Sequence, residues 1–146
     1  MQSAVGQIGR VIVGKAEPGE DLINVVTELV NKHDITAGLV NIIGAFEKFT
    51  IGYFDLDSKE YQFKTIDEKV ELLSTMGNIS YNKETDEPII HLHTMVGRSD
   101  YSIMGGHLSQ PSIISVTAEI FIYELDKKLK RTGENPFDLT LLDLNK

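Results

Sequence analysis

The stretch Pro88-Ile89-Ile90-His91-Leu92-His93-Thr94-Met95-Val96 places two histidines two positions apart in an apolar run. Its apolar and β-branched residues predict a strand, and side chains alternate between the two faces of a strand. His91 and His93 are therefore expected to project from one face, about 6–7 Å apart along the chain. Two imidazoles placed in this way can supply two ligands of a metal ion.

A third histidine, His107, follows a predicted turn at Gly97-Arg98-Ser99-Asp100 and a short run at 101–104 that predicts a second strand. If this strand folds back as a hairpin, His107 comes beside the first pair. Gly105 and Gly106 precede it, and glycine lets two backbones approach closely or lets the chain turn. Three imidazole nitrogens would leave one position on a metal ion for water or substrate.

Two simpler explanations compete with a metal site. A histidine on a strand is often a partly buried polar residue with a hydrogen-bond partner, and two on one face can form a solvated patch. However, three of the chain's four histidines lie between positions 91 and 107, and this clustering favours the metal site. The fourth, His33, is expected at the end of a helix and not as a ligand.

Strand patterns dominate the remainder of the chain. The stretch 36–46 is apolar at successive positions, which predicts a central strand buried on both faces. Between Leu22 and Val30, apolar residues have the spacing of an amphipathic helix. The predicted strands cover residues 7–16, 36–46, 48–55, 60–67, 70–81 with a bulge at Gly77-Asn78, 88–96, 101–104, 113–125 and 137–144. The pattern predicts an α+β fold, in which one main helix packs on a mostly antiparallel mixed β-sheet of about seven or eight strands. We expect a single domain over residues 1–146.

Composition narrows the possible functions. The chain has no cysteine, so disulfides and thiolate chemistry are excluded. No apolar run approaches the ~20 residues that span a bilayer, and the first residues do not resemble a signal peptide. We therefore expect a cytoplasmic protein without a membrane partner. The net charge of −8 argues against binding duplex DNA over the general surface. The basic run at 127–131 could contact nucleic acid, but it lacks interleaved aromatics and is predicted to be a solvated loop.

Three further residues are candidates for roles around the histidines. Glu119 lies among apolar residues of a predicted strand, and Glu71 lies on another. Either could assist a metal as an outer-shell residue or general base, although Glu119 could equally face solvent. Arg98, close in sequence to the histidines, could attract an anion to the site or only cap its turn.

Several motifs, in this order, resemble the PPC domain, the plant-and-prokaryote-conserved domain that stands alone in bacteria and archaea and is joined to AT-hook motifs in plants. The motifs are Pro18-Gly19-Glu20-Asp21-Leu22, Gly44-Ala45-Phe46, Glu71-Leu72-Leu73-Ser74-Thr75-Met76-Gly77-Asn78-Ile79, Pro88-Ile89-Ile90-His91-Leu92-His93 and Gly105-Gly106-His107-Leu108. The resemblance implies a PPC-like mixed fold, a homotrimer formed by sheet packing, and a metal ion held by three histidines, which here are His91, His93 and His107. It also implies a role connected with DNA, although this chain has no Arg-Gly-Arg-Pro hook.

Two functions follow from these observations. The first is a homotrimeric regulatory module with DNA or a protein as partner, whose metal is structural or sensory. The second is a metal-dependent enzyme or a binder of a small anionic molecule, because three neutral nitrogens and an open position can lower the pKa of metal-bound water. In both we expect one divalent transition metal ion per chain. Imidazole ligands favour zinc, nickel, copper or iron, and we expect zinc.

Overall fold

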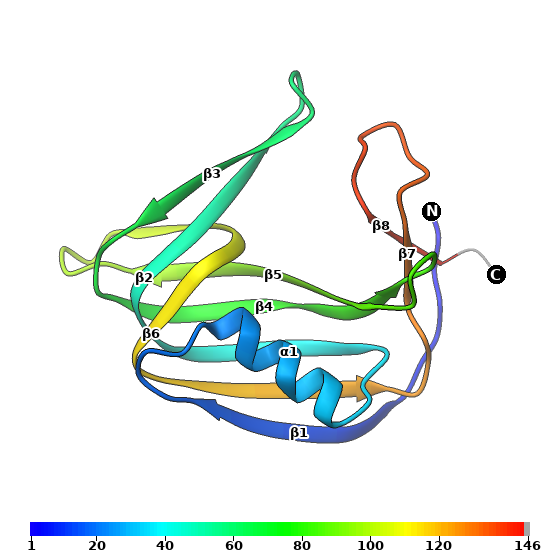
Figure 1. The fold of residues 1–146 in the computed structure, drawn as a ribbon, viewed down its shortest axis with the longest axis horizontal. Helices are drawn as coiled ribbons and strands as arrows, with labels where there is room; N and C mark the ends of the chain where they lie inside the picture. The colour runs from blue at the N-terminus through cyan, green and yellow to red at the C-terminus, as the bar shows by residue number, and fades with distance from the viewer. Residues whose placement is uncertain (145–146) are drawn as a thin grey trace.

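The structure, a computed structural model, describes residues 1–144. In this part of the chain it contains one sheet of eight strands and one helix, which confirms the predicted α+β class. The neighbouring strands pair antiparallel except for β4 and β7, so the sheet is mixed (Figure 1). The elements in chain order are β1 (Ile8–Ala16), α1 (Leu22–Lys32), β2 (Gly38–Asp55), β3 (Glu60–Ile66), β4 (Val70–Asn82), β5 (Pro88–Gly97), β6 (Ile103–Leu125), β7 (Lys130–Thr132) and β8 (Leu141–Asp143).

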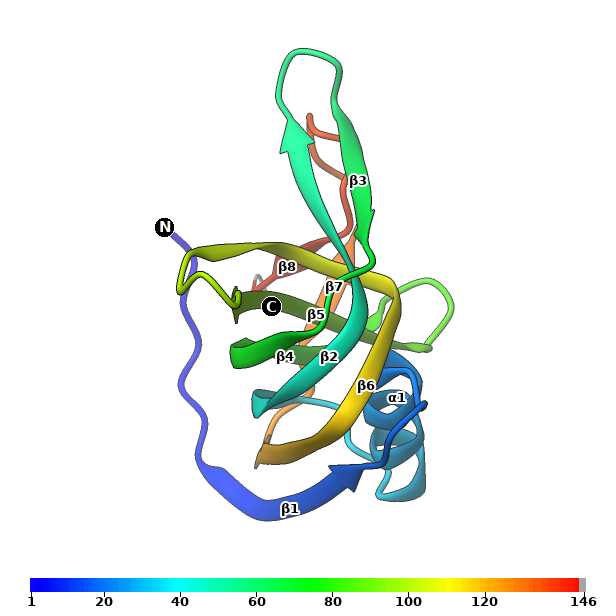
Figure 2. The ribbon, with the colours of Figure 1, turned by 90° about the vertical axis from the view of Figure 1, so that its left-hand side faces the viewer.

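The two longest strands, β2 and β6, allow the sheet to curl round on itself. The start of β6 pairs with β5, and its later part pairs with β2 and β1. The first part of β2 also pairs with β4, and its last part pairs with β3. Because β4 pairs with β5 as well, β2, β4, β5 and β6 form a closed ring of strands, from which the β2–β3 hairpin projects (Figures 1 and 2).

Some predicted boundaries were wrong. The two strands expected at 36–46 and 48–55 are the single strand β2, and those expected at 101–104 and 113–125 are the single strand β6. In both strands, register shifts let the backbone bend without ending the hydrogen-bonded ladder. The bulge expected at Gly77-Asn78 lies instead between Leu72 and Ser74, and the final strand covers only Leu141–Asp143.

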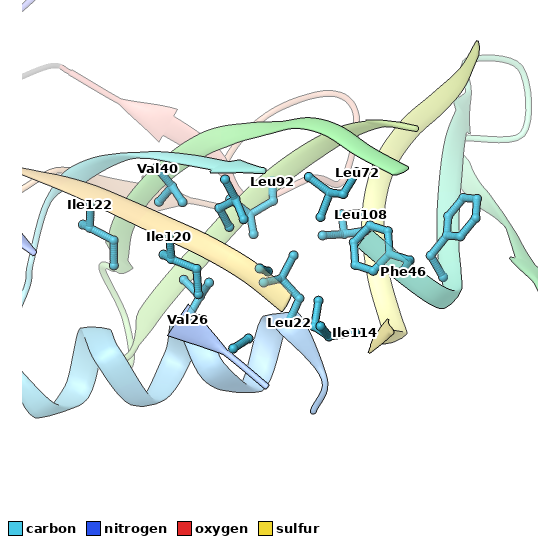
Figure 3. Packing of buried hydrophobic residues seen from close by; sticks show 14 of the residues in the cluster. Leu22, Val26, Val40, Phe46, Leu72, Leu92, Leu108, Ile114, Ile120 and Ile122 are labelled. Carbon is cyan, nitrogen blue, oxygen red and sulfur yellow. The ribbon is translucent and has the colours of Figure 1, made fainter. Parts of the chain in front are cut away.

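The hydrophobic core lies between α1 and the inner face of the strand ring. The Asp21 carboxylate caps α1 by accepting hydrogen bonds from the backbone N–H groups of Ile23 and Asn24. The predicted apolar stripe of α1 faces inward, and Leu22 and Val26 are fully buried. Figure 3 shows these side chains facing Ile114, Ile120 and Ile122 of β6 and Leu92 of β5. Packing of Leu92 in the core therefore holds one face of β5 inward, and His91 and His93 project from the opposite face.

The opposite side of the sheet, which we call the outer face, carries the histidines. Cross-strand partners project from the same face of a sheet. One row of successive partners runs across the outer face through Val13, Phe121, Asn41, Met76, His93 and His107. The prediction that the 36–46 stretch is buried on both faces is wrong for the single chain, because Leu39 and Ile43 on the outer face are 50% and 52% exposed. The histidines therefore lie at one end of an exposed and largely apolar surface.

Candidate metal centre

Two neighbouring strands bring the three histidines together. His91 and His93 lie on β5, and His107 on β6 is the direct cross-strand partner of His93. The predicted hairpin is thus confirmed, as is the close approach suggested by the glycines that precede His107. A Cβ atom at Gly105 would lie 2.3 Å from the carbonyl oxygen of Thr94 on β5, so a side chain there would force the two strands apart.

The three imidazole rings have the separations that a shared metal ion requires. The Nε2 atoms of His91 and His93 are 3.1 Å apart, and one nitrogen from each of the three rings lies within 4.8 Å of the others. Two nitrogens bound to a tetrahedral zinc ion at about 2.0–2.1 Å are roughly 3.3 Å apart. Small side-chain movements would thus allow all three nitrogens to reach one ion.

His107 has a buried ring nitrogen that the described residues leave unsatisfied. Its Nδ1 atom is buried and has no hydrogen-bond partner among residues 1–144, and buried polar atoms are normally paired. The ring also packs against Tyr61 of β3, with 4.7 Å between ring centroids, and lies 6.3 Å from the ring of Phe63. A metal ion fits these residues for two reasons. Nitrogens of the three rings lie close together, and the buried Nδ1 of His107 has no hydrogen-bond partner among the described residues.

A buried arginine lies behind His91. Arg131 is 5% exposed, and its Nη2 atom lies 2.9 Å from Nδ1 of His91 and 2.9 Å from the side-chain oxygen of Asn78. Its Nε donates to the hydroxyl of Ser80, and Nη1 donates to the carbonyl of Thr140. A guanidinium group can only donate, so Nδ1 of His91 accepts and the proton of the neutral ring is on Nε2, the nitrogen that faces His93. Arg131 therefore orients the ring of His91 toward the other two histidines.

The same surroundings keep two of the three histidines, His91 and His107, neutral. Burial, followed by the nearby charges of Arg131, His107 and His93, lowers the pKa of His91 to about 4. Burial and the neighbouring His93 and Arg131 also lower the pKa of His107. A metal ion does not bind a protonated imidazolium, and both rings are uncharged at neutral pH. An ion bound at Nε2 of His91 would displace the proton that this nitrogen carries.

The other predicted site residues lie away from this cluster. Arg98 forms an ion pair with Glu68, with 3.0 Å between Nη2 and the carboxylate. Glu71 pairs with Gly97, at the far end of β5 from His91. Glu119 is exposed on β6 and pairs with Ile43. The structure brings the three histidines together, but it does not bring these three residues to them.

Sequence reasoning missed the residues that surround the histidines. The run at 127–131 was predicted to be a solvated loop, and this is wrong for Arg131, which lies buried in β7. Tyr61 and Asn78 were also not singled out. The alternation of residues 60–67 does place Tyr61 and Phe63 on one face of a strand, but it does not indicate that this face meets His107. No local pattern indicates that the three-residue strand β7 pairs with the distant β4.

A family model named the Plants and Prokaryotes Conserved (PCC) domain matches residues 3–126. The chain belongs to this family. The matched region contains all three histidines of the candidate site, whereas Arg131 and strands β7 and β8 follow it. No curated protein sequence is similar enough to count as a match.

Solved structures of PPC-type proteins have the same fold. A PPC protein from Pyrococcus horikoshii is 30% identical over 100% of this chain and 99% of its own, with a TM-score of 0.87. A metal-containing protein from Archaeoglobus fulgidus is 29% identical over 97% of this chain and 99% of its own, also with a TM-score of 0.87. A proposed DNA-binding protein from Bacteroides thetaiotaomicron is 29% identical over 94% of both chains, with a TM-score of 0.86. Among the described residues, no helix has both the length and the apolar character needed to cross a membrane.

Proposed function

We propose that this PCC-family protein binds one divalent transition metal ion, zinc in the first instance, through His91, His93 and His107. The observation that carries the proposal is the convergence of three imidazoles from two strands, with one nitrogen of each ring within 4.8 Å of the others. The buried Nδ1 of His107 and the similarity to a metal-containing archaeal protein support it. The ion would act as a Lewis acid with at least one position open to a further ligand.

Metal content of the purified protein tests this proposal. The wild-type chain should contain about one zinc or other transition metal ion per chain by elemental analysis. His93→Ala should lose it, because His93 is exposed and its truncation removes a ligand without removing core packing. His33→Ala is the matched control, since His33 caps α1 away from the cluster. Equal metal content in all three proteins, or none in the wild type, would contradict the metal site.

We also propose that the protein forms a homotrimer through its outer face. Leu39 and Ile43 are 50% and 52% exposed there, which supports a surface that a second copy covers. Leu39→Asp should shift the protein from trimer to monomer in light scattering, because a charge at an apolar interface is costly to bury. Asn31→Asp adds the same charge on α1 and should leave the trimer intact. A wild-type protein that is monomeric at all concentrations would refute the proposal.

For the biological role we propose regulation connected with DNA, as the name of the Bacteroides relative suggests. The net charge of −8 favours contact through an assembly or a protein partner over broad contact with DNA by this chain. A mobility-shift assay at 50 and 200 mM salt tests this role. Binding that weakens strongly with salt would demonstrate direct phosphate contact, and its absence would leave the partner-mediated role.

The second candidate is a metal-dependent enzyme or a binder of a small anionic molecule. Arg131 favours it, because a buried positive charge lies directly behind one of the proposed metal ligands. This candidate and the regulatory module share the same metal site. They differ in whether the open position of the ion is used by an external ligand.

A further inference from the structure

The positive charge of Arg131, which lies behind the histidine cluster, is uncompensated in the described chain. Arg131 donates hydrogen bonds to four groups, namely the hydroxyl of Ser80, the carbonyl of Thr140, the amide oxygen of Asn78 and the ring of His91. None of the four carries a negative charge. Within residues 1–144, no carboxylate oxygen forms an ion pair with its guanidinium. Buried charges are normally paired, so this arrangement calls for a negative group from elsewhere.

A metal ion on the three histidines would make this imbalance larger. The group of potential ligands consists of the three histidines alone, without an aspartate or glutamate among the described residues. The candidate carboxylates Glu71 and Glu119 lie elsewhere on the outer face, paired with Gly97 and Ile43. The cluster would then combine the charge of the ion with that of Arg131, and a neutral ligand would leave both uncompensated.

Apolar side chains border the same cluster on two sides. The rings of Tyr61 and Phe63 lie beside His107. On the other side, Met76 of β4 is the cross-strand partner of His93 and is 60% exposed. A ligand that reached the open position of the metal would touch these groups with any part that extends beyond its charged end. The surroundings thus suit a negative group that carries a small apolar body.

We infer that the site binds a small organic anion, whose negative group occupies the open position of the metal and is favoured by the charge of Arg131. This inference rests on the proposed metal site. Arg131 acts across the ring of His91 and not by direct contact, so its effect is long-range. Charges in a partly screened site attract each other even without direct contact. We therefore expect loss of the Arg131 charge to weaken anion binding about tenfold.

Replacement of Arg131 by two different residues separates its charge from its hydrogen bonds. Arg131→Lys and Arg131→Gln both disrupt the contacts with Ser80 and Thr140, but only lysine keeps the positive charge. Lys127→Gln is the control for total charge, because Lys127 is exposed in the segment that precedes β7. Each protein is loaded with cobalt(II), whose visible spectrum reports changes in its ligands, and is titrated with isobutyrate.

The expected order of affinity identifies the source of the effect. Wild type, Lys127→Gln and Arg131→Lys should bind isobutyrate within about threefold of one another, and Arg131→Gln about tenfold more weakly. Isobutyramide, the neutral isostere, should not alter the wild-type spectrum, and formate should bind more weakly than isobutyrate because it lacks the apolar body. The comparison of isobutyrate with isobutyramide uses only the wild-type protein. It therefore shows whether the negative charge of the ligand is needed, even if an Arg131 variant fails to fold.

The possible failures are distinguishable. If cobalt and zinc do not bind to the wild-type protein, both the metal site and this inference are overturned. If the metal binds but isobutyrate leaves the spectrum unchanged, or isobutyramide binds equally well, only the organic-anion inference is overturned. If Arg131→Lys weakens binding as much as Arg131→Gln, Arg131 serves to hold β7 and His91 in place, and its charge does not select the ligand.

Discussion

Replacement of Gly77 by alanine tests whether close contact between β4 and β5 determines the position of the histidines. A Cβ atom at Gly77 would lie 1.9 Å from the carbonyl oxygen of His91 and 2.9 Å from the Cα atom of Leu92, and Cβ contacts under 3.0 Å are essentially never found. The obstructing atoms belong to the backbone, so no side-chain rotation can relieve the overlap. The two strands must separate by about 1 Å, which exceeds the tolerance of about 0.2 Å in metal–ligand distances.

We expect Gly77→Ala to lower the free energy of unfolding by about 3 kcal/mol, the upper end of the usual cost of overpacking. We also expect at least tenfold weaker metal binding, since both β5 histidines move. Urea unfolding of the metal-free protein measures the first effect, and competition with a chromogenic chelator measures the second. Gly133→Ala is the control, because a Cβ atom there meets nothing within 4 Å. Unchanged unfolding and metal affinity in Gly77→Ala would refute the reasoning.

Three further predictions concern the site and the helix. Because the folded pKa of His91 is about 4 and the unfolded value about 6.5, the unfolded state binds more protons between these values. Acid unfolding of the metal-free protein should therefore show stability that is full above pH 6.5 and falls by about 2 kcal/mol toward pH 4, after allowance for partial exposure, and His91→Gln should reduce this loss. Zinc at a hundred times its Kd should add about 2.7 kcal/mol and raise Tm by about 8 °C in a thermal scan, and a similar rise in His93→Ala would contradict the site. Asp21→Ala should cost about 2–3 kcal/mol in urea unfolding, because the carboxylate caps α1 and also accepts the backbone N–H of Ser112.

The parts that sequence alone predicts are those determined by local patterns. Alternation and two-residue spacing placed His91 and His93 on one face, and the Gly97–Asp100 turn placed His107 beside them. The apolar stripe likewise predicted α1, with His33 at its end. These predictions succeeded because each depends on residues that are close together in the sequence.

Features that depend on distant pairing were not predictable in this way. Nothing local distinguishes two strands from one bent strand, so β2 and β6 were each divided into two. A basic run is commonly solvated, and Arg131 departs from this rule only because β7 pairs with β4, some 50 positions earlier in the chain. The exposure of the outer face was not predictable for the same reason. Alternation in the sequence shows that a face of the sheet is apolar, but it does not show what covers that face.

The pairing of β1 with β6 has a consequence for how the protein acquires its fold. The backbone N–H of Gln7 bonds to Asp126, 119 positions further along, and Ile12 pairs with Ile122. During synthesis β1 emerges long before its partner β6 and remains unpaired. Val11 and Val13 are then accessible to other nascent chains. Topologies with such distant contacts usually form in milliseconds to seconds. We therefore expect the ribosome to release nearly the whole chain before the sheet can close.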